Sequence, residues 1–331
     1  MSNITNFVIE IKTLLNEARN RVYKNINEIM TKTYFEIGKR VVQEEQRGNR
    51  RADYGKNLLK KLSVELTKEF GKGFSVANLK NMRQFYLAFQ NRQTVSSEFK
   101  LSYSHYIFLS RIKNENERDF YEIESVKNSW SSRELRRQFD SALYERLLLS
   151  KDKNQIKQLA KSGQVVEKPK DLIKDPYILE FVGLDEKSSY SESELEQRLI
   201  DKIEHFLLEL GKGFTFVARQ KRFTFDEEHF RVDLVFYNRL LRCFILIDLK
   251  IGKLKHQDLR QMVMYVNYFD RCEKAEDENP TIGIILCKDK NDTLIELTLP
   301  KDSQIFASKY QTILPKKEDF KHLLMDSSDE N

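Results

Sequence analysis

The sequence is poor in the residues that mark several classes of protein. Its 331 residues include 3 cysteines, 5 prolines, 11 glycines and a single tryptophan. The cysteines, Cys243, Cys272 and Cys287, have no C-x-x-C spacing, which favours reduced thiols in a cytoplasmic protein over disulfides or a zinc site. No run approaches the roughly 18 consecutive apolar residues of a membrane span, and the first residues lack a signal peptide's pattern. No G-x-x-x-x-G-K-[ST] loop occurs, which excludes a P-loop motor.

Composition and charge indicate a globular chain whose charge is unevenly distributed along the sequence. Hydrophobic residues make up 40% and charged residues 33%, enough to bury the core of one large or two ordinary domains. The net charge is +6. Residues 1–150 hold 27 Lys and Arg against 18 Asp and Glu, and the remainder holds 30 against 33. We therefore expect nucleic-acid affinity mainly in the first half, although solvated helix faces would give the same composition.

Periodicity and turn signals divide the chain into two domains of different class. Residues 1–150 are expected to be helical and basic, residues 151–178 a Lys-rich linker, and residues 179–331 a second domain with a central mixed sheet flanked by helices. The fold class is thus α+β. The helices expected in the first domain span 7–45, 55–70, 75–89, 102–111 and 131–149. In the second, a helix (193–210), a strand (214–225), a hairpin (230–250), a helix (256–271) and a strand (281–287) are expected.

Residues 55–89 have the pattern of a helix-turn-helix. Two helical stretches flank Gly71-Lys-Gly-Phe, and no acidic residue occurs from Phe70 to Ser97. A basic second helix after a tight turn is typical of a DNA reader, although an ordinary helical hairpin with a basic face remains an alternative. The residues expected near a groove or a phosphate are Lys72, Asn78, Lys80, Asn81 and Arg83.

Two apolar runs in the second domain are each expected to form a buried strand, and each contains an acidic residue. Asp233 lies in the first run and Asp248 in the second, and Asn238-Arg239 makes a connection short enough for a hairpin. Lys250 shares a strand face with Asp248 because residues two apart point the same way. Two carboxylates and an ammonium at one end of a hydrophobic hairpin are costly unless a hard divalent cation compensates them. The alternative is an ion cluster at a strand end.

Flanking helices supply further candidates for the same site. Glu196 lies at the edge of the apolar stripe of the preceding helix, where it could be a third metal ligand; it could equally form a capping box with Ser193. Gln261 and Tyr265 lie one turn apart on the following helix, where Gln261 could touch the substrate and Tyr265 could stack or donate a hydrogen bond. Taken alone, such a helical Gln and Tyr would more often be a surface and a core residue.

In the order helix, strand, strand, helix, these residues resemble the PD-(D/E)XK nuclease superfamily. Asp248-Leu-Lys250 is similar to its D/E-x-K motif and Gln261-xxx-Tyr265 to its RecB-like branch, with Val232 in place of the nominal proline and Asp248 in place of the more frequent glutamate. The resemblance extends to the YhcG-type family through Trp130-Ser-Ser-Arg-Glu-Leu135, Lys174-Asp-Pro-Tyr177 and Asn279-Pro-Thr-Ile-Gly-Ile-Ile-Leu-Cys287. It implies a restriction-endonuclease-like domain after a helical domain, with a role in DNA processing or defence.

The sequence therefore predicts a metal-dependent nuclease that hydrolyses phosphodiester bonds in DNA. Asp233, Asp248 and Glu196 would hold Mg²⁺, or Mn²⁺ in its place, Lys250 would stabilise charge, and Gln261 and Tyr265 would support the reaction. A homodimer is a further expectation, since nucleases that cut both strands often pair. The alternative is a catalytically silent nucleic-acid-binding or assembly protein that retains the nuclease fold.

Overall fold

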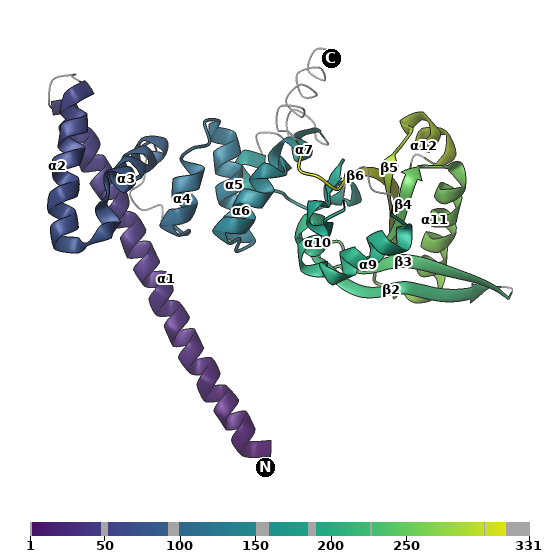
Figure 1. Ribbon diagram of the computed structural model, residues 1–331. Helices are drawn as coiled ribbons and strands as arrows, with labels where there is room; N and C mark the ends of the chain where they lie inside the picture. The colour runs from purple at the N-terminus through teal and green to yellow at the C-terminus, as the bar shows by residue number, and fades with distance from the viewer. Residues whose placement is uncertain are drawn as a thin grey trace. The chain divides into compact units, whose positions relative to one another are not determined.

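The computed structural model describes residues 2–47, 52–91, 99–149, 159–184, 190–225, 227–300 and 302–315. The chain divides into two compact units, Met1–Arg136 and Arg137–Asn331, each considered by itself below (Figure 1). Residues 151–158 of the expected linker lie outside the described residues. Among the described helices, none has the length and apolar character needed to cross a membrane.

The first unit is helical, as the sequence predicts. Its helices are α1 (Ser2–Arg47), α2 (Ala52–Phe70), α3 (Val76–Phe89), α4 (Tyr103–Leu109) and α5 (Glu115–Lys127), and α6 (Ser132–Asp140) spans the division between the units. The core around Leu79 and Met82 joins α1, α2 and α3. Gly38 of α1 faces the Met82 carbonyl so closely that a side chain there would clash, which sets the close crossing of α1 and α3.

Between α2 and α3 the chain makes one turn of 3-10 helix, η1 (Lys72–Phe74). Ser75 then caps α3 by accepting a hydrogen bond from the backbone N–H of Asn78. Phe70 and Phe74 contact each other edge to face across the turn, at 5.9 Å between ring centroids. This arrangement of helix, tight turn and helix follows the expected ranges within a few residues.

The second unit contains a six-stranded mixed sheet, as predicted. Its strands have the order β1-β6-β5-β4-β3-β2. Strands β2, β3 and β4 are antiparallel to one another, and β4, β5, β6 and β1 are parallel to one another. Of these, β2, β3, β4 and β5 match expected strands. The strands are β1 (Tyr177–Ile178), β2 (Phe214–Phe225), β3 (Glu228–Asn238), β4 (Cys243–Lys253), β5 (Ile282–Asp289) and β6 (Ile305–Gln311).

Helices cover both faces of this sheet (Figure 1). On one face, α9 (Glu192–Asp201) and α10 (Ile203–Leu210) pack on Leu234, Phe236 and Ile247. On the other, α11 (His256–Tyr268) packs on Val235 and Leu246. Strand β4 is buried on both faces, which explains its nearly continuous apolar sequence. The remaining elements are α7 (Leu143–Leu149), η2 (Pro169–Leu172), η3 (Glu180–Val182), the π-helical turn η4 (Phe269–Glu273) and α12 (Asp292–Thr298).

A cluster of buried charges links α7 and α10 within this unit. The guanidinium of Arg146 lies 2.6 Å from a carboxylate oxygen of Glu209, and both side chains are fully buried. Arg146 also donates to the carbonyl of Pro176, while Lys174 donates to the carbonyl of Glu209. Burial alone would raise the pKa of Glu209, but Arg146 and the neighbouring cations overcome this and lower it to about 2. The ion pair therefore remains charged inside the protein.

Candidate active site

Strands β3 and β4 form the predicted hairpin and bring Asp233 and Asp248 together. Strand β3 pairs with β4 in an antiparallel register from Leu234 opposite Ile247 onward, so Asp233 and Asp248 lie just beyond the last pair. The two carboxyl groups are near enough for Asp233 to raise the pKa of Asp248. The backbone N–H of Leu249 donates to Oδ2 of Asp233 at 2.8 Å, which ties the first carboxylate to the second strand.

Asp248 is buried, with 3% of its surface exposed. Burial, together with the nearby Asp233 carboxylate, raises the pKa of Asp248 to about 7. Its Oδ2 atom is shielded from solvent. Nζ of Lys250 lies 2.8 Å from that oxygen, as an ion pair. Asp248 is thus a carboxylate whose negative charge is only partly compensated.

Lys250 shares its strand face with Asp248, as expected from their spacing. Burial works to lower the pKa of Lys250, but the Asp248 carboxylate outweighs it and raises that pKa to about 12. Glu192 of α9 lies 3.9 Å from Nζ and also accepts a hydrogen bond from the backbone N–H of Ile251. The ammonium therefore stays protonated and is held between the sheet and α9.

Glu196 of α9 is joined to the same site through Gln220 of β2, a residue that the sequence did not indicate as part of the site. The side-chain amide of Gln220 on β2 donates to Oε2 of Glu196 at 2.5 Å and to Oδ1 of Asp233 at 3.0 Å. Arg219 lies beside it, with Nε 3.1 Å from Oε1 of Glu196. Burial raises the pKa of Glu196, and the hydrogen bond from Gln220 opposes that rise. The only signal in the sequence was a polar run, Arg219-Gln-Lys-Arg222, inside an expected strand.

The alternative role of Glu196 in a capping box with Ser193 is wrong. Helix α9 begins at Glu192, so Ser193 lies within its first turn. Its N-cap is Ser191, which accepts a hydrogen bond from the backbone N–H of Glu194 at 3.1 Å. Glu196 is instead buried, with 4% of its surface exposed, and its carboxylate faces Gln220 and Arg219. Its position serves the site and not the helix start.

Gln261 and Tyr265 lie on one face of α11 and contact each other. The amide of Gln261 donates to the hydroxyl of Tyr265. Tyr265 is buried in the core between α11 and the sheet. Burial raises the pKa of Tyr265, and the Asp248 and Asp233 carboxylates add to that rise. The pair thus lies within electrostatic range of the two carboxylates.

The side chains of β3 do not alternate regularly between the two faces of the sheet. A regular strand would place Val232 and Leu234 in the same core. The structure assigns Leu234 to the core under α9 and α10, and Val232 to the core under α11. The alternation of β3 side chains between the two faces of the sheet is therefore interrupted at Asp233. This irregularity coincides with Gln220 on the neighbouring strand, which has a left-handed φ of 46°.

The donor set fits a divalent cation in part. Carboxylate oxygens are the ligands that Mg²⁺ and Mn²⁺ prefer, and the buried Asp248 carboxylate lies near that of Asp233 with the Lys250 ammonium as its counter-charge. Across the described residues, no group of three or more His, Cys, Asp or Glu side chains is already assembled around a cation position. Two neighbouring carboxylates are therefore in place, while Glu196 is joined to Asp233 through the Gln220 amide.

The five residues expected to contact DNA lie on or just before α3. Lys72 and Lys80 are exposed, whereas Asn78 and Asn81 are half-buried. Asn78 donates its amide to the carbonyl of Gly73 at 3.0 Å, which ties the turn to the helix. Arg83 lies 2.6 Å from Glu45 of α1 as an ion pair. Lys72 and Lys80 are thus the most accessible of the five.

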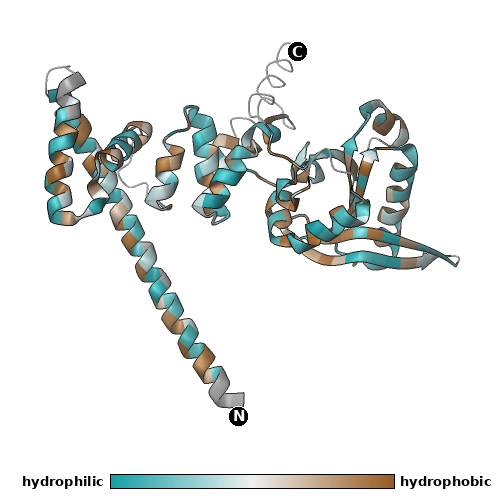
Figure 2. Ribbon diagram, in the orientation of Figure 1, coloured by the Kyte–Doolittle hydropathy of each residue, from teal (hydrophilic) through white to brown (hydrophobic). Residues whose placement is uncertain are grey.

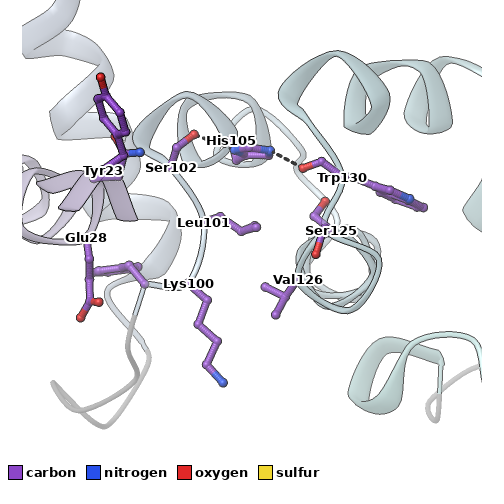
Figure 3. Close-up of a pocket in the computed structure, with 12 residues that line it drawn as sticks. Tyr23, Glu28, Lys100, Leu101, Ser102, His105, Ser125, Val126 and Trp130 are labelled. Carbon is purple, nitrogen blue, oxygen red and sulfur yellow. Dashed lines mark hydrogen bonds between the residues drawn. The ribbon is translucent and has the colours of Figure 1, made fainter. Parts of the chain in front are cut away.

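The first unit also contains a pocket of about 740 Å³ between α1, α4 and α5 (Figure 3). His105 lies at its wall with both ring nitrogens engaged. Nδ1 is 2.7 Å from the hydroxyl of Ser102, and Nε2 is 3.0 Å from the carbonyl of Trp130. Burial lowers the pKa of His105. The histidine is therefore a neutral residue that joins α4 to the end of α5, which agrees with a structural role.

The second unit matches a nuclease-type domain, since a family model described as "YhcG PDDEXK nuclease domain" covers residues 170–325. A second, described as "DUF1016 N-terminal domain", matches residues 10–146. The Escherichia coli (strain K12) protein called "Putative nuclease YhcG" is 40% identical over 333 residues, which cover 91% of this chain and 88% of that protein. The chain belongs to the YhcG family of PD-(D/E)XK nuclease-type proteins.

Two solved structures are more distantly similar. A repair endonuclease from Pyrococcus abyssi is 18% identical over 38% of this chain and 50% of that one, with a TM-score of 0.27. EndoMS in a complex with double-stranded DNA is 17% identical over 39% of this chain and 48% of that one, with a TM-score of 0.27. The chain spans about half the length of these two proteins.

Proposed function

We propose that the second unit is a nuclease that hydrolyses phosphodiester bonds in DNA with the help of a divalent cation. The observation that carries this proposal is the proximity of the Asp233 and Asp248 carboxylates, with the ammonium of Lys250 2.8 Å from Asp248. Buried like charges of this kind are costly in a protein, and a cation offsets that cost. A role in DNA processing or defence, in the cytoplasm, is part of the proposal.

Asp233 and Asp248 would hold the cation, Mg²⁺ or Mn²⁺, and Glu196 would be its third ligand or would position a water molecule. When bound, the ion would lower the pKa of water and compensate the charge of a phosphate group. The ammonium of Lys250 is close enough to the carboxylates to stabilise the negative charge that builds on the phosphate in the transition state. Tyr265 and Gln261 would orient the substrate from the α11 side.

The first unit would bind the DNA backbone. Residues 1–150 carry an excess of nine positive charges, and Lys72 and Lys80 are exposed at the turn and on α3. Phosphate contacts of this kind give affinity without sequence specificity. We assign Asn78, Asn81 and Arg83 a supporting part, because Asn78 and Arg83 already bond to Gly73 and Glu45.

A nicking assay tests the proposal. Purified protein with Mg²⁺ or Mn²⁺ should nick or degrade DNA, and Asp248→Ala should abolish the activity while DNA binding stays intact. Asp292→Ala is the matched control, because that carboxylate is exposed on α12. Equal nicking by the Asp248→Ala variant would mean a contaminating nuclease or a wrong site.

One observation favours a catalytically silent protein as the second candidate. Both carboxylate oxygens of Asp233 already accept hydrogen bonds, from Gln220 and from the backbone of Leu249. A carboxylate satisfied in this way could be a purely structural element of the hairpin. In that case the protein would bind DNA with unchanged affinity after Asp248→Ala, and neither form would cut it in any divalent metal.

A further inference from the structure

The amino-terminal part of α1 carries large apolar side chains that the described chain does not cover. Phe7, Leu14 and Ile29 are exposed to 61%, 63% and 62%. Figure 2 shows hydrophobic residues recurring along this helix where it extends beyond α2 and α3. A contiguous apolar surface of this extent is rare on a monomer and marks a contact with another molecule.

The carboxyl-terminal part of α1 is packed against the rest of the first unit. From Thr31 onward it packs on α3, and Val41 and Val42 are buried. Helices are stabilised mainly by the packing of an apolar face, so a long stretch without such packing is marginal in water. Residues 6–29 therefore need a partner surface that the described residues of the first unit do not supply.

The apolar residues of this stretch recur with the spacing of a coiled coil. Steps of three and four residues connect Val8, Ile11, Leu15, Ala18, Val22 and Ile29, with Asn25 at the one polar position of the series. The line opposite, at steps of seven, is uncharged and polar: Asn6, Thr13, Asn20 and Asn27. An apolar seam sustained over three heptads and backed by a polar line is the pattern by which helices associate side by side. A single polar residue within such a seam fixes the register of the pair.

We propose that this face of α1 is a self-association surface, and that its occupant is the same face of a second copy of the chain. The charge of this stretch favours a second copy of the chain over a phosphate-rich partner such as a nucleic acid or an anionic membrane. Residues 6–30 contain four basic residues (Lys12, Arg19, Arg21, Lys24) and three acidic ones (Glu10, Glu17, Glu28), so two copies do not repel each other. Nucleic acids and anionic membranes select strongly basic faces, which this stretch lacks.

The area is sufficient for a pair. Burial of a half-exposed aliphatic side chain removes roughly 60 Å² of apolar surface from water. Eight half-exposed side chains along the seam and its edge then give about 500 Å² per copy, or about 1,000 Å² in total, which reaches the lower bound of a specific interface. The exposed residues that add to the seam at its edge are Phe7, Leu14 and Ile26.

The mass of the full-length chain in solution tests the proposal. Wild-type protein should sediment with a mass near twice 39.4 kDa at concentrations above the dissociation constant and should dissociate on dilution. Leu15→Glu with Val22→Glu places two charges on the seam, seven residues apart, and should give a monomer. Asn6→Glu with Thr13→Glu places the same charges at the same spacing on the opposite line and should leave the dimer intact.

A measurement on the unmodified chain guards against a variant that fails to fold. Backbone amides of residues 6–29 should exchange hydrogen more slowly at high than at low protein concentration, because pairing protects the helix. A monomeric wild-type protein with concentration-independent exchange would overturn the proposal, as would dissociation by both pairs of substitutions. Binding of the wild-type monomer to anionic vesicles through residues 6–29 would assign the face to a membrane surface and overturn it as well. None of these readouts depends on nuclease activity.

Discussion

Gln220 on β2 lies opposite Asp233 on β3, and its amide Nε2 is 3.0 Å from Oδ1 of the carboxylate. The two residues lie between two regular pairs of β2 and β3, Arg219 with Leu234 and Lys221 with Val232, and the register of the two strands shifts nearby, between Phe216 and Ala218. Gln220 has a φ of 46°, which costs a non-glycine residue about 1–2 kcal/mol. The surrounding structure holds it there, and the amide is thereby shared between two candidate metal ligands.

Replacement of Gln220 separates its two roles. Gln220→Ala and Gln220→Gly both remove the amide, so both should lower kcat by about tenfold as Glu196 and Asp233 lose their common donor. Only the glycine variant tolerates the left-handed backbone, and it should unfold at a higher urea concentration than the alanine variant. The comparison requires steady-state nicking rates and urea denaturation of both proteins. Unchanged kcat in both would remove Gln220 from the site.

Lys250 should act on the reaction and not on the fold. Lys250→Met removes the ammonium beside Asp248 and should lower kcat by about 10²–10³-fold, the range for one lost electrostatic stabiliser, with little change in DNA affinity. Lys250→Arg keeps the charge and should recover part of the rate. Because the neighbouring carboxylates raise the pKa of Lys250 to about 12, its deprotonation should not limit activity near neutral pH. A Lys250→Met variant as active as the wild type contradicts the assigned role.

The buried pair of Arg146 and Glu209 gives the second unit a defined acid sensitivity. The pKa of Glu209 lies at about 2 in the folded protein and near 4.5 when unfolded, so folding favours its ionised form. The resulting stability is present above pH 4.5 and is lost as the pH falls toward 2. Its size is about 3 kcal/mol, from roughly 1.4 kcal/mol per pKa unit. Urea denaturation between pH 6 and pH 3 measures the larger part of this loss, about 2 kcal/mol.

Two substitutions isolate that contribution. Glu209→Gln removes the titrating group, and its unfolding free energy should depend less steeply on pH over this interval. Arg146→Met leaves Glu209 buried without its main counter-charge and should destabilise the unit by about 3–5 kcal/mol. If the pH dependence of Glu209→Gln equals that of the wild type, other carboxyl groups cause the acid sensitivity.

DNA affinity should depend on Lys80 through a phosphate contact. Lys80→Ala should weaken binding to all sequences to a similar degree and reduce the slope of log K against log salt by about 1. Lys113→Ala is the control, because Lys113 is equally exposed but lies outside the turn and α3. Fluorescence anisotropy at several salt concentrations measures both slopes. Equal losses in the two variants would mean that the basic charge of the unit acts diffusely.

The sequence predicted the hairpin of β3 and β4 because local rules determine it. A short connection between two apolar runs predicted their pairing, and the antiparallel register of Leu234 with Ile247 confirms it. The edge position of Glu196 on its helix followed in the same way from a period of 3.6. Such residues are positioned by their own element, and the pattern of that element is visible in the chain.

What the sequence did not reveal depends on contacts between distant elements. Gln220 became visible only when the register of β2 against β3 was known, since its own strand reads as an ordinary polar run. The interruption of β3 at Asp233 and the short strand β1 were missed for the same reason. Strand β6 was also missed, although it pairs with both β5 and β1 at the far side of the sheet. Long-range pairing leaves little local pattern in a sequence.

The position of a bound divalent cation tests the central claim most directly. A structure of the wild-type protein with Mn²⁺ should place carboxylate oxygens of Asp233 and Asp248 within about 2.0–2.6 Å of the ion. It should also show the Lys250 ammonium still beside Asp248. An ion bound elsewhere in the second unit, or no ion at the hairpin at saturating Mn²⁺, would contradict the account.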